Sequence, residues 1–323
     1  MQVIGEAKGV KLHSPKDAYF SFFNSPYSGH SHAAAIDVYP SHQEWGGSVV
    51  SPVTGKLVRI QKTAMGRKKI FPTEDHDFGI AIEPEDCEGA IVRILHCKPT
   101  LIEGDTVNRG DKIGITIRSR YFNYWTGPHY HAEIMHLDSF PRSTRSYPLA
   151  LPFEFQETAS KEIDTETEFL IESVTDDNIV GYPKDFSHTS IGQFSGLSAI
   201  NDKSNIIGII DGGLSHYKHG GVIGQKSGLE GSTIKLQSIP VGVTKRSLKG
   251  ASFFQRDPSI SSYLNDSELR GLSYFIFTKK YIKNGIPQLV LVPKIYKEFT
   301  GKISEGDICT LKIDSASNTI KAE

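Results

Sequence analysis

Two histidines separated by one residue, inside a stretch with the alternating pattern of a β-strand, constrain this chain more than any other feature. They are His129 and His131, within the segment 126–134. Because side chains along a strand alternate between its two faces, both imidazoles lie on the same face. The other face carries apolar side chains, at Tyr130, Ala132 and Ile134. The pattern predicts a strand with one face on a core and the other lining a cleft, where a metal ion and a base can be held together.

A second histidine-rich segment lies upstream, where His30 and His32 shortly precede Asp37 at the start of a hydrophobic turn. Imidazole and carboxylate groups are ordinary zinc ligands, and catalytic zinc usually has three protein ligands with water in the fourth position. A histidine and Asp37 from this segment, together with His131, would complete such a set. Nine of the twelve histidines precede residue 140, so histidine chemistry is concentrated in this part of the chain.

The order of these segments and three further motifs resembles that of the lysostaphin and LytM type of zinc metallopeptidase. The resemblance covers roughly residues 28–136, and the further motifs are 51–58 (SPVTGKLV), 94–96 (ILH) and 103–114 (EGDTVNRGDKIG). It implies a compact all-β domain of the duplicated-hybrid-motif type, a β-barrel or sandwich. It also implies a zinc-dependent endopeptidase that hydrolyses peptide bonds, including peptide cross-links of cell walls.

The resemblance assigns a role to individual residues by their position in its motifs. Asp37 and His131 correspond to metal ligands, with Zn²⁺ as the implied cofactor. His96 and His129 correspond to the pair that orients or deprotonates the zinc-bound water. Tyr27, ten residues before Asp37, falls where such enzymes often carry a tyrosine that helps to stabilise the oxyanion.

The first motif departs from the family pattern, which has three residues between the ligand histidine and the aspartate. Four residues separate His32 from Asp37, and six separate His30 from Asp37. On a regular strand, both offsets send the histidine to the face opposite Asp37. A β-bulge in the run 33–35 would restore the facing, because a bulge inserts one residue. We therefore expect His32 to be the third ligand, with His30 as the alternative, unless the metal site is altered or lost.

Two other functions remain open for these residues. In the first, the domain is a catalytically inactive binding or scaffold module, as the irregular spacing before Asp37 allows. In the second, it is a histidine phosphocarrier, because sugar phosphocarriers of the phosphotransferase system share the duplicated hybrid fold and use two facing histidines. Asp37 together with His131 favours a metal site over phosphoryl transfer.

The length of 323 residues exceeds one typical domain and predicts a second one. A polar and charged stretch at 155–168 places the boundary near Ala159, which gives domains at 1–158 and 159–323. The second domain has short apolar runs punctuated by glycine, which are typical of strands. One helix is expected to open at Asp266 or Ser267 and to run to Phe275. We expect this mostly-β domain to bind substrate or a partner.

Charge and composition limit the classes of molecule that this protein is expected to bind. The formal net charge is −1 and the isoelectric point is about 6.9, which makes nucleic acid an unlikely partner. The resemblance implies a peptide or peptidoglycan-like polymer as the substrate. The segment 1–8 lacks the pattern of a signal peptide, and no run approaches the ~20 apolar residues of a membrane span. These features predict a cytoplasmic protein, or one released by a route that needs no signal. Three cysteines are too few for a disulfide framework.

Overall fold

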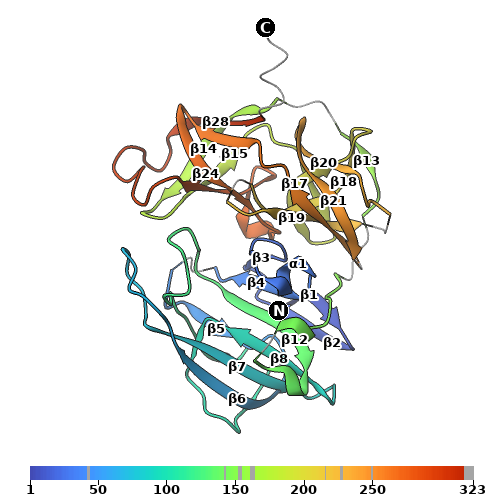
Figure 1. Ribbon diagram of the computed structural model, residues 1–323, viewed down its shortest axis with the longest axis vertical. Helices are drawn as coiled ribbons and strands as arrows, with labels where there is room; N and C mark the ends of the chain where they lie inside the picture. Colours follow the sequence, from blue (N-terminus) through green and yellow to red (C-terminus); the bar gives the residue numbers. More distant parts are fainter. Residues whose placement is uncertain are drawn as a thin grey trace. The chain divides into compact units, whose positions relative to one another are not determined.

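The structure is a computed structural model that describes residues 1–41, 44–141, 143–151, 155–160, 164–214, 216–225, 228–248 and 250–315. These residues form strands almost throughout (Figure 1), and they divide into two compact units. The first unit contains Met1–Phe20 and Tyr27–Pro152, and the second contains Ser21–Pro26 and Phe153–Glu323. The prediction of an all-β fold in two domains is confirmed.

The second unit differs in extent from the predicted domain 159–323, because it begins at Phe153 and also includes Ser21–Pro26. The early segment packs there because the carboxylate of Asp211, which is fully buried, accepts hydrogen bonds from two backbone amides. Phe22 N and Phe23 N lie 2.6 and 3.0 Å from Asp211 Oδ2. The rings of both phenylalanines are also buried. No local shift in composition marks the point where the chain first enters the second unit, at Ser21. Its second entry, at Phe153, lies just before the charged stretch 155–168.

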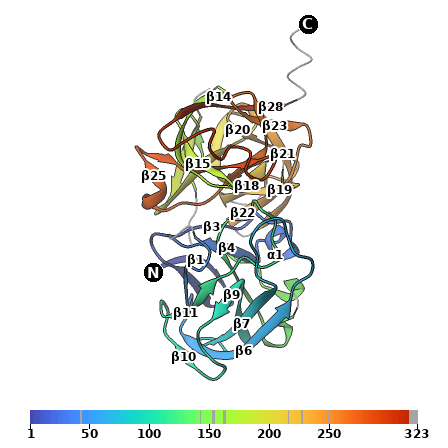
Figure 2. The same cartoon turned by 90° about the vertical axis from the view of Figure 1, so that its left-hand side faces the viewer.

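Three sheets form the first unit. The largest has the strand order β10-β6-β7-β8-β12-β4-β3, and a three-stranded sheet has the order β5-β11-β9. Figure 2 shows β9 and β11 of the smaller sheet next to each other. A hairpin of β1 and β2 makes the third. The strand bounds are β1 Gln2–Ala7, β2 Val10–Ser14, β3 Tyr19–Ser21, β4 Ala35–Tyr39, β5 Ser48–Val50, β6 Gly55–Ala64, β7 His76–Pro84, β8 Ala90–Leu95, β9 Cys97–Pro99, β10 Thr106–Val107, β11 Lys112–Thr116 and β12 Tyr130–His136.

Strand β12 is the strand predicted around His129 and His131, and it lies in the middle of the largest sheet between β4 and β8. Its core-facing residues are buried as predicted, with Tyr130, Ala132 and Ile134 each at most 1% exposed. Strands β7 and β8 form an antiparallel hairpin. Strands β4, β12, β8 and β7 are consecutive neighbours in this sheet. Side chains that project from the same face of these strands therefore lie close together.

Helices are few and short in the described part of the chain. α1 spans Ser28–Ser31, and 3-10 turns span Leu137–Ser139 (η1), Ser143–Arg145 (η2) and Lys279–Tyr281 (η3). None of these elements has the length and apolar character that crossing a bilayer as a helix would require.

The second unit is built around a fourteen-stranded sheet with a long apolar core. The strand bounds are β13 Thr158–Ala159, β14 Glu166–Val174, β15 Ile179–Pro183, β16 His188–Ile191, β17 Phe194–Ile200, β18 Asn205–Leu214, β19 His219–Gln225, β20 Thr233–Leu236, β21 Ile239–Leu248, β22 Gly250–Arg256, β23 Ile260–Leu264, β24 Ser267–Tyr274, β27 Leu289–Pro293 and β28 Ile308–Ser315, with a separate hairpin of β25 Ile282–Lys283 and β26 Ile286–Pro287.

The helix predicted from Asp266 or Ser267 to Phe275 is wrong, because this segment forms strand β24. Strands β23 and β24 pair antiparallel with Leu264 opposite Ser267, which leaves a two-residue turn at 265–266. Asn265 has a φ of +52°, the left-handed conformation that such hairpin turns require and that asparagine adopts readily. Of the two residues interpreted as a helix cap, Asp266 therefore lies in a hairpin turn and Ser267 begins β24.

Candidate metal centre

The centre is built on a cross-strand pair. In the antiparallel pairing of β12 with β4, His131 lies directly opposite Asp37, so both side chains project from the same face of the sheet. The distance between His131 Nδ1 and Asp37 Oδ1 is 2.9 Å. Both side chains are buried, with Asp37 3% and His131 7% exposed. These two side chains, on the face predicted to line a cleft, are therefore largely shielded from solvent.

His30 joins this pair through a helical turn instead of a bulge. The amides of His30 and Ser31 donate to the carbonyl oxygen of Tyr27, at 3.1 and 3.2 Å, and close the short helix α1. Ala33 then adopts a φ of +50°, a left-handed conformation of the kind that ends helices. This turn takes up the additional residues before Asp37 and places His30, which is 1% exposed, against the sheet.

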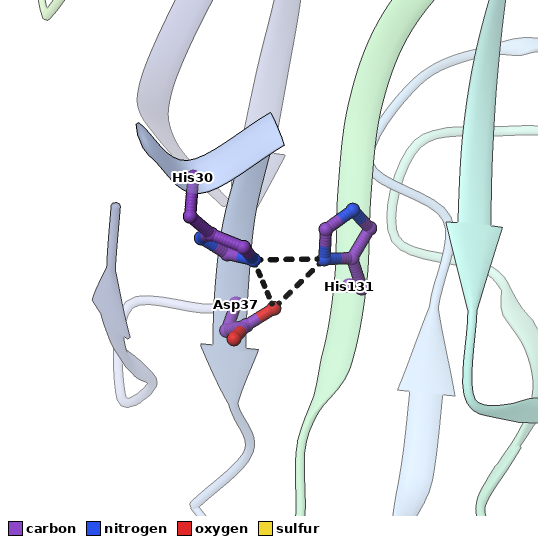
Figure 3. A group of neighbouring side chains, drawn as sticks. All are labelled: His30, Asp37 and His131. Carbon is purple, nitrogen blue, oxygen red and sulfur yellow. Dashed lines mark hydrogen bonds and ion pairs between the residues drawn. The ribbon is translucent and has the colours of Figure 1, made fainter. Parts of the chain in front are cut away.

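The three side chains form a small triangle (Figure 3). His30 Nε2 lies 3.2 Å from Asp37 Oδ1 and 3.1 Å from His131 Nδ1. Zinc bonds of about 2.0–2.2 Å in tetrahedral geometry require ligand atoms to be roughly 3.3–3.6 Å apart. The observed separations differ from this range by a few tenths of an ångström. The three residues therefore fit a tetrahedral divalent ion in donor type and in spacing.

His32 does not take part in this group. Its side chain is exposed, and its Nδ1 lies 2.8 Å from the carbonyl oxygen of Ser28 and 3.2 Å from Ser31 Oγ. The expectation that a bulge would bring His32 to Asp37 is wrong, because helix α1 turns His30 inward and His32 outward. Of the two histidines that the sequence left as alternatives, the structure brings His30 to the centre.

The neighbouring groups shift the pKa values of both Asp37 and His131. Burial disfavours the Asp37 carboxylate, but the electrostatic effects of His30 and His129 outweigh it and hold the pKa of Asp37 well below its usual range. Burial also disfavours a charged His131, but hydrogen bonds to Asp37 and Glu133 outweigh it and raise the pKa of His131 to about 9. A proton on His131 therefore supplies positive charge, and a metal ion must displace it to bind.

Glu133 supports His131 from the side away from Asp37. It lies two residues further along β12, is fully buried, and places its Oε1 3.2 Å from His131 Nε2. Arg93 donates to the same oxygen from Nε at 2.7 Å, and Ser146 Oγ donates to Glu133 Oε2. Burial opposes ionisation, but His131 and Arg93 outweigh it and lower the pKa of Glu133 to about 2. A carboxylate that fixes the ring of a ligand histidine is common in metal sites.

His96, predicted to act in catalysis, lies next to this centre. Strand β8 ends at Leu95, and His96 follows with a φ of +63°, which is uncommon for a residue with a side chain. Its ring centroid lies 5.4 Å from that of His129 and 6.3 Å from that of His131. Its Nδ1 lies 2.7 Å from Asp77 Oδ2. The structure thus brings His96 to the other histidines.

His129, the second predicted catalytic histidine, is held by its own loop. Its Nδ1 lies 2.9 Å from the carbonyl oxygen of Gly127, and its Nε2 lies 3.8 Å from Asp37 Oδ1. Burial is the main reason that the pKa of His129 falls to about 4, although Asp37 acts in the opposite direction. His129 is therefore neutral at physiological pH and has one nitrogen available toward the centre.

Tyr27 is exposed, at 48%. Its ring stacks on that of Tyr121, with centroids 5.2 Å apart, and Tyr121 in turn stacks on His96 at 5.4 Å. Tyr27 also caps α1, the helix that carries His30. Tyr27 is therefore connected to the centre by ring stacking through Tyr121 and by the backbone of α1.

Sequence reasoning missed Glu133 and Asp77. A signal for Glu133 was present, because it continues the period of two set by His129 and His131 on the same strand face. No comparable signal marks Asp77, since its contact with His96 depends on the pairing of β7 with β8 and on the positive φ of His96.

The chain matches two models of one family, a domain of unknown function called DUF8155. The model of its N-terminal domain matches residues 11–151, and the model of its C-terminal domain matches residues 183–286. The centre lies wholly within the N-terminal match. No curated protein matches the chain.

Two solved structures are similar at low levels. One is an M23 metalloprotease, pseudoalterin from the deep sea, with 14% identity, a TM-score of 0.26, and coverage of 42% of this chain and 71% of the other. The second is the solution structure of lysostaphin, with 14% identity, a TM-score of 0.25, and coverage of 74% of this chain and 94% of the other. At these TM-scores neither similarity supports an argument about the site, which rests on its own geometry.

Proposed function

We propose that the first unit is a zinc-dependent hydrolase of peptide bonds. The observation that carries the proposal is the buried triangle of His30, Asp37 and His131, whose donor atoms lie 2.9–3.2 Å apart. Two histidines and one carboxylate are a common donor set of catalytic zinc, which leaves a fourth position open. Zinc in such a site polarises a carbonyl group and lowers the pKa of bound water to about 7.

The chain's own residues divide the remaining work. His30, Asp37 and His131 would hold the ion, and Glu133 keeps the ring of His131 in place. His96 and His129 would accept and return protons, the role that histidines commonly have in general acid–base catalysis. Asp37 contacts His30, His129 and His131, and the ring centroid of His96 lies 5.4 Å from that of His129, which supports placing these roles in one centre.

The proposed substrate is a peptide, including peptide cross-links in a peptidoglycan-like polymer. The order of the sequence motifs supports this substrate class, and Tyr27 supports it through its exposed phenol beside Tyr121. A phenolic hydroxyl in this position is suited to donate a hydrogen bond to the developing oxyanion.

Hydrolysis assays with defined peptides and with peptidoglycan fragments test the function. The zinc-loaded protein should release new amino termini, and removal of zinc by a chelator should abolish the release until zinc is restored. Asp37→Ala should be inactive, and His32→Ala, an exposed histidine from the same segment, should be as active as the parent protein. Zinc-loaded protein that cleaves none of these substrates would refute the proposal in favour of an inactive binding or scaffold module.

The phosphocarrier alternative is disfavoured by one contact. Asp37 Oδ1 lies 3.2 Å from His30 and 2.9 Å from His131, so a phosphoryl group on either ring would face a carboxylate across a hydrogen-bond distance. Like charges at this distance repel strongly in a buried site. Incubation with a phosphohistidine donor should therefore leave the protein unphosphorylated.

A further inference from the structure

We propose that Asp77 is a positioning residue for His96, which it holds in the tautomer with the proton on Nδ1 so that Nε2 is left to accept a proton during hydrolysis. The part of this inference that concerns hydrolysis rests on the proposed function. The tautomer itself is a property of the protein alone and is measured without substrate.

The contact joins two neighbouring strands. Asp77 lies at the start of β7, and His96 directly follows the end of β8, its partner in the sheet. The distance between His96 Nδ1 and Asp77 Oδ2 is 2.7 Å, and both side chains are at most 10% exposed. Such a short and buried contact between an imidazole and a carboxylate orients the ring strongly.

The carboxylate of Asp77 accepts hydrogen bonds at both oxygens. The backbone amide of Phe78 donates to Oδ1 at 2.7 Å, and the hydroxyl of Ser119 donates to Oδ2 at 2.8 Å. Burial opposes ionisation of Asp77, but His96 and these donors outweigh it and lower the pKa of its carboxyl group. Because an ionised carboxylate has no proton to donate, His96 Nδ1 must be the donor in their contact.

The rest of the surroundings hold the His96 ring in this orientation. Its backbone amide donates to the carbonyl oxygen of Phe78 at 3.0 Å, and its carbonyl oxygen accepts from the amide of Ile117 at 3.1 Å. The ring contacts Phe122 edge-on, with centroids 4.5 Å apart, and stacks on Tyr121. The uncommon positive φ of His96 is thus maintained by contacts on several sides.

Asp77→Asn makes the proposal testable, because the structure predicts which way the new amide must face. The backbone N–H of Phe78 can only donate a hydrogen bond, so the atom at the position of Oδ1 must be the oxygen of the asparagine side chain. Its NH₂ group then occupies the position of Oδ2 and donates to His96 Nδ1. His96 must accept this hydrogen bond and move its proton to Nε2, which removes the acceptor that the proposal requires.

The tautomer is read from long-range ¹H–¹⁵N spectra of the full chain labelled with ¹⁵N-histidine, with the His96 signals assigned from His96→Gln. We expect the Nδ1–H form in the parent protein and the Nε2–H form in Asp77→Asn. Asp75→Asn is the matched control, because it makes the same chemical change at an exposed position of the preceding turn. It should leave the His96 signals unchanged.

Two results would overturn the proposal. One is an Nε2–H form of His96 in the parent protein, which needs no variant and so does not depend on whether Asp77→Asn folds. The other is a retained Nδ1–H form in Asp77→Asn.

Activity and zinc content separate this inference from the proposed function. On a peptide that the parent protein cleaves, Asp77→Asn should lower kcat by about 10²–10⁴-fold, the usual contribution of general acid–base catalysis, with KM and zinc content unchanged. Loss of zinc would mean that Asp77 acts on the metal ligands, against the proposal. If the parent protein cleaves no peptide, the proposed hydrolase fails, while the tautomer result still decides the role of Asp77.

Discussion

The buried pair of Arg93 and Glu133 gives the sharpest test of the architecture around the centre. The two residues lie directly opposite each other in the pairing of β8 with β12. Arg93 donates from Nε to Glu133 Oε1 at 2.7 Å and from a terminal nitrogen to the carbonyl oxygen of Phe140 at 2.6 Å. Arg93→Met keeps an unbranched apolar stem in this position and removes only the guanidinium group. The carboxylate of Glu133 then loses one of its two cationic partners, Arg93 and His131.

The expected loss of stability follows from what remains around Glu133. Removal of one partner from a buried ion pair costs about 3–5 kcal/mol, because the other charge is left uncompensated. Glu133 still has the hydroxyl of Ser146 and the ring of His131, which is protonated at neutral pH in the metal-free protein because its pKa is about 9. We therefore expect a loss at the lower end, about 3 kcal/mol.

The assay is urea unfolding followed by tryptophan fluorescence. The two tryptophans, Trp45 and Trp125, both lie in the first unit, so the signal reports on this unit alone. With a urea dependence of about 1–3 kcal/mol/M, a loss of about 3 kcal/mol lowers the midpoint by roughly 1–3 M. Lys56→Met, the same type of change at an exposed position of β6, should shift the free energy of unfolding by less than about 0.5 kcal/mol.

A double variant refines the test. Arg93→Met combined with Glu133→Gln removes both charges, so it should be less destabilised than Arg93→Met alone. An unchanged midpoint in Arg93→Met, or a double variant that is less stable than the single one, would refute the reasoning.

Three further predictions concern the centre itself. His30→Ala should lose high-affinity zinc binding and His32→Ala should keep it, as measured by competition with a chromophoric chelator; the reverse result would restore the ligand expected from sequence. Because the folded-state pKa of His131 is raised to about 9 from its usual 6.5, the stability that His131 contributes to the metal-free first unit should be fully present below about pH 6.5 and should be lost as the pH rises toward 9. Urea midpoints that rise over this pH range would contradict that assignment. Tyr27→Phe, which removes only the phenolic hydroxyl, should lower kcat and leave the zinc content unchanged; an unchanged kcat would remove Tyr27 from the mechanism.

Much of the centre was predictable because it depends on strand periodicity. The alternation around His129 and His131 identified the strand and both its faces, and the upstream aspartate proved to be the cross-strand partner of His131. The same periodicity also places Glu133 on this face of the strand, although Glu133 was not among the predicted site residues. Sequence patterns of this kind are informative wherever one face of a sheet is buried and register is therefore specified.

The remaining features depend on backbone conformations that periodicity does not encode. His30 reaches the centre because four residues form a helical turn and Ala33 then adopts a positive φ, whereas a strand with a bulge would have selected His32. Likewise, Asp266 was compatible with a helix cap and with a hairpin turn, and the pairing of β23 with β24 places it in the turn. Polar residues that favour both caps and turns carry no information about which one forms.

Zinc analysis of the purified full chain, beside Asp37→Ala and His131→Ala, tests the central claim most directly. Each protein is stripped of metal, incubated with one equivalent of zinc, and passed over a desalting column before the bound metal is measured. The account predicts about one zinc ion per chain in the parent protein and a large loss in both variants, because each removes one of three ligands. Equal zinc in all three proteins, in folded form, would contradict the assignment of a metal centre to His30, Asp37 and His131.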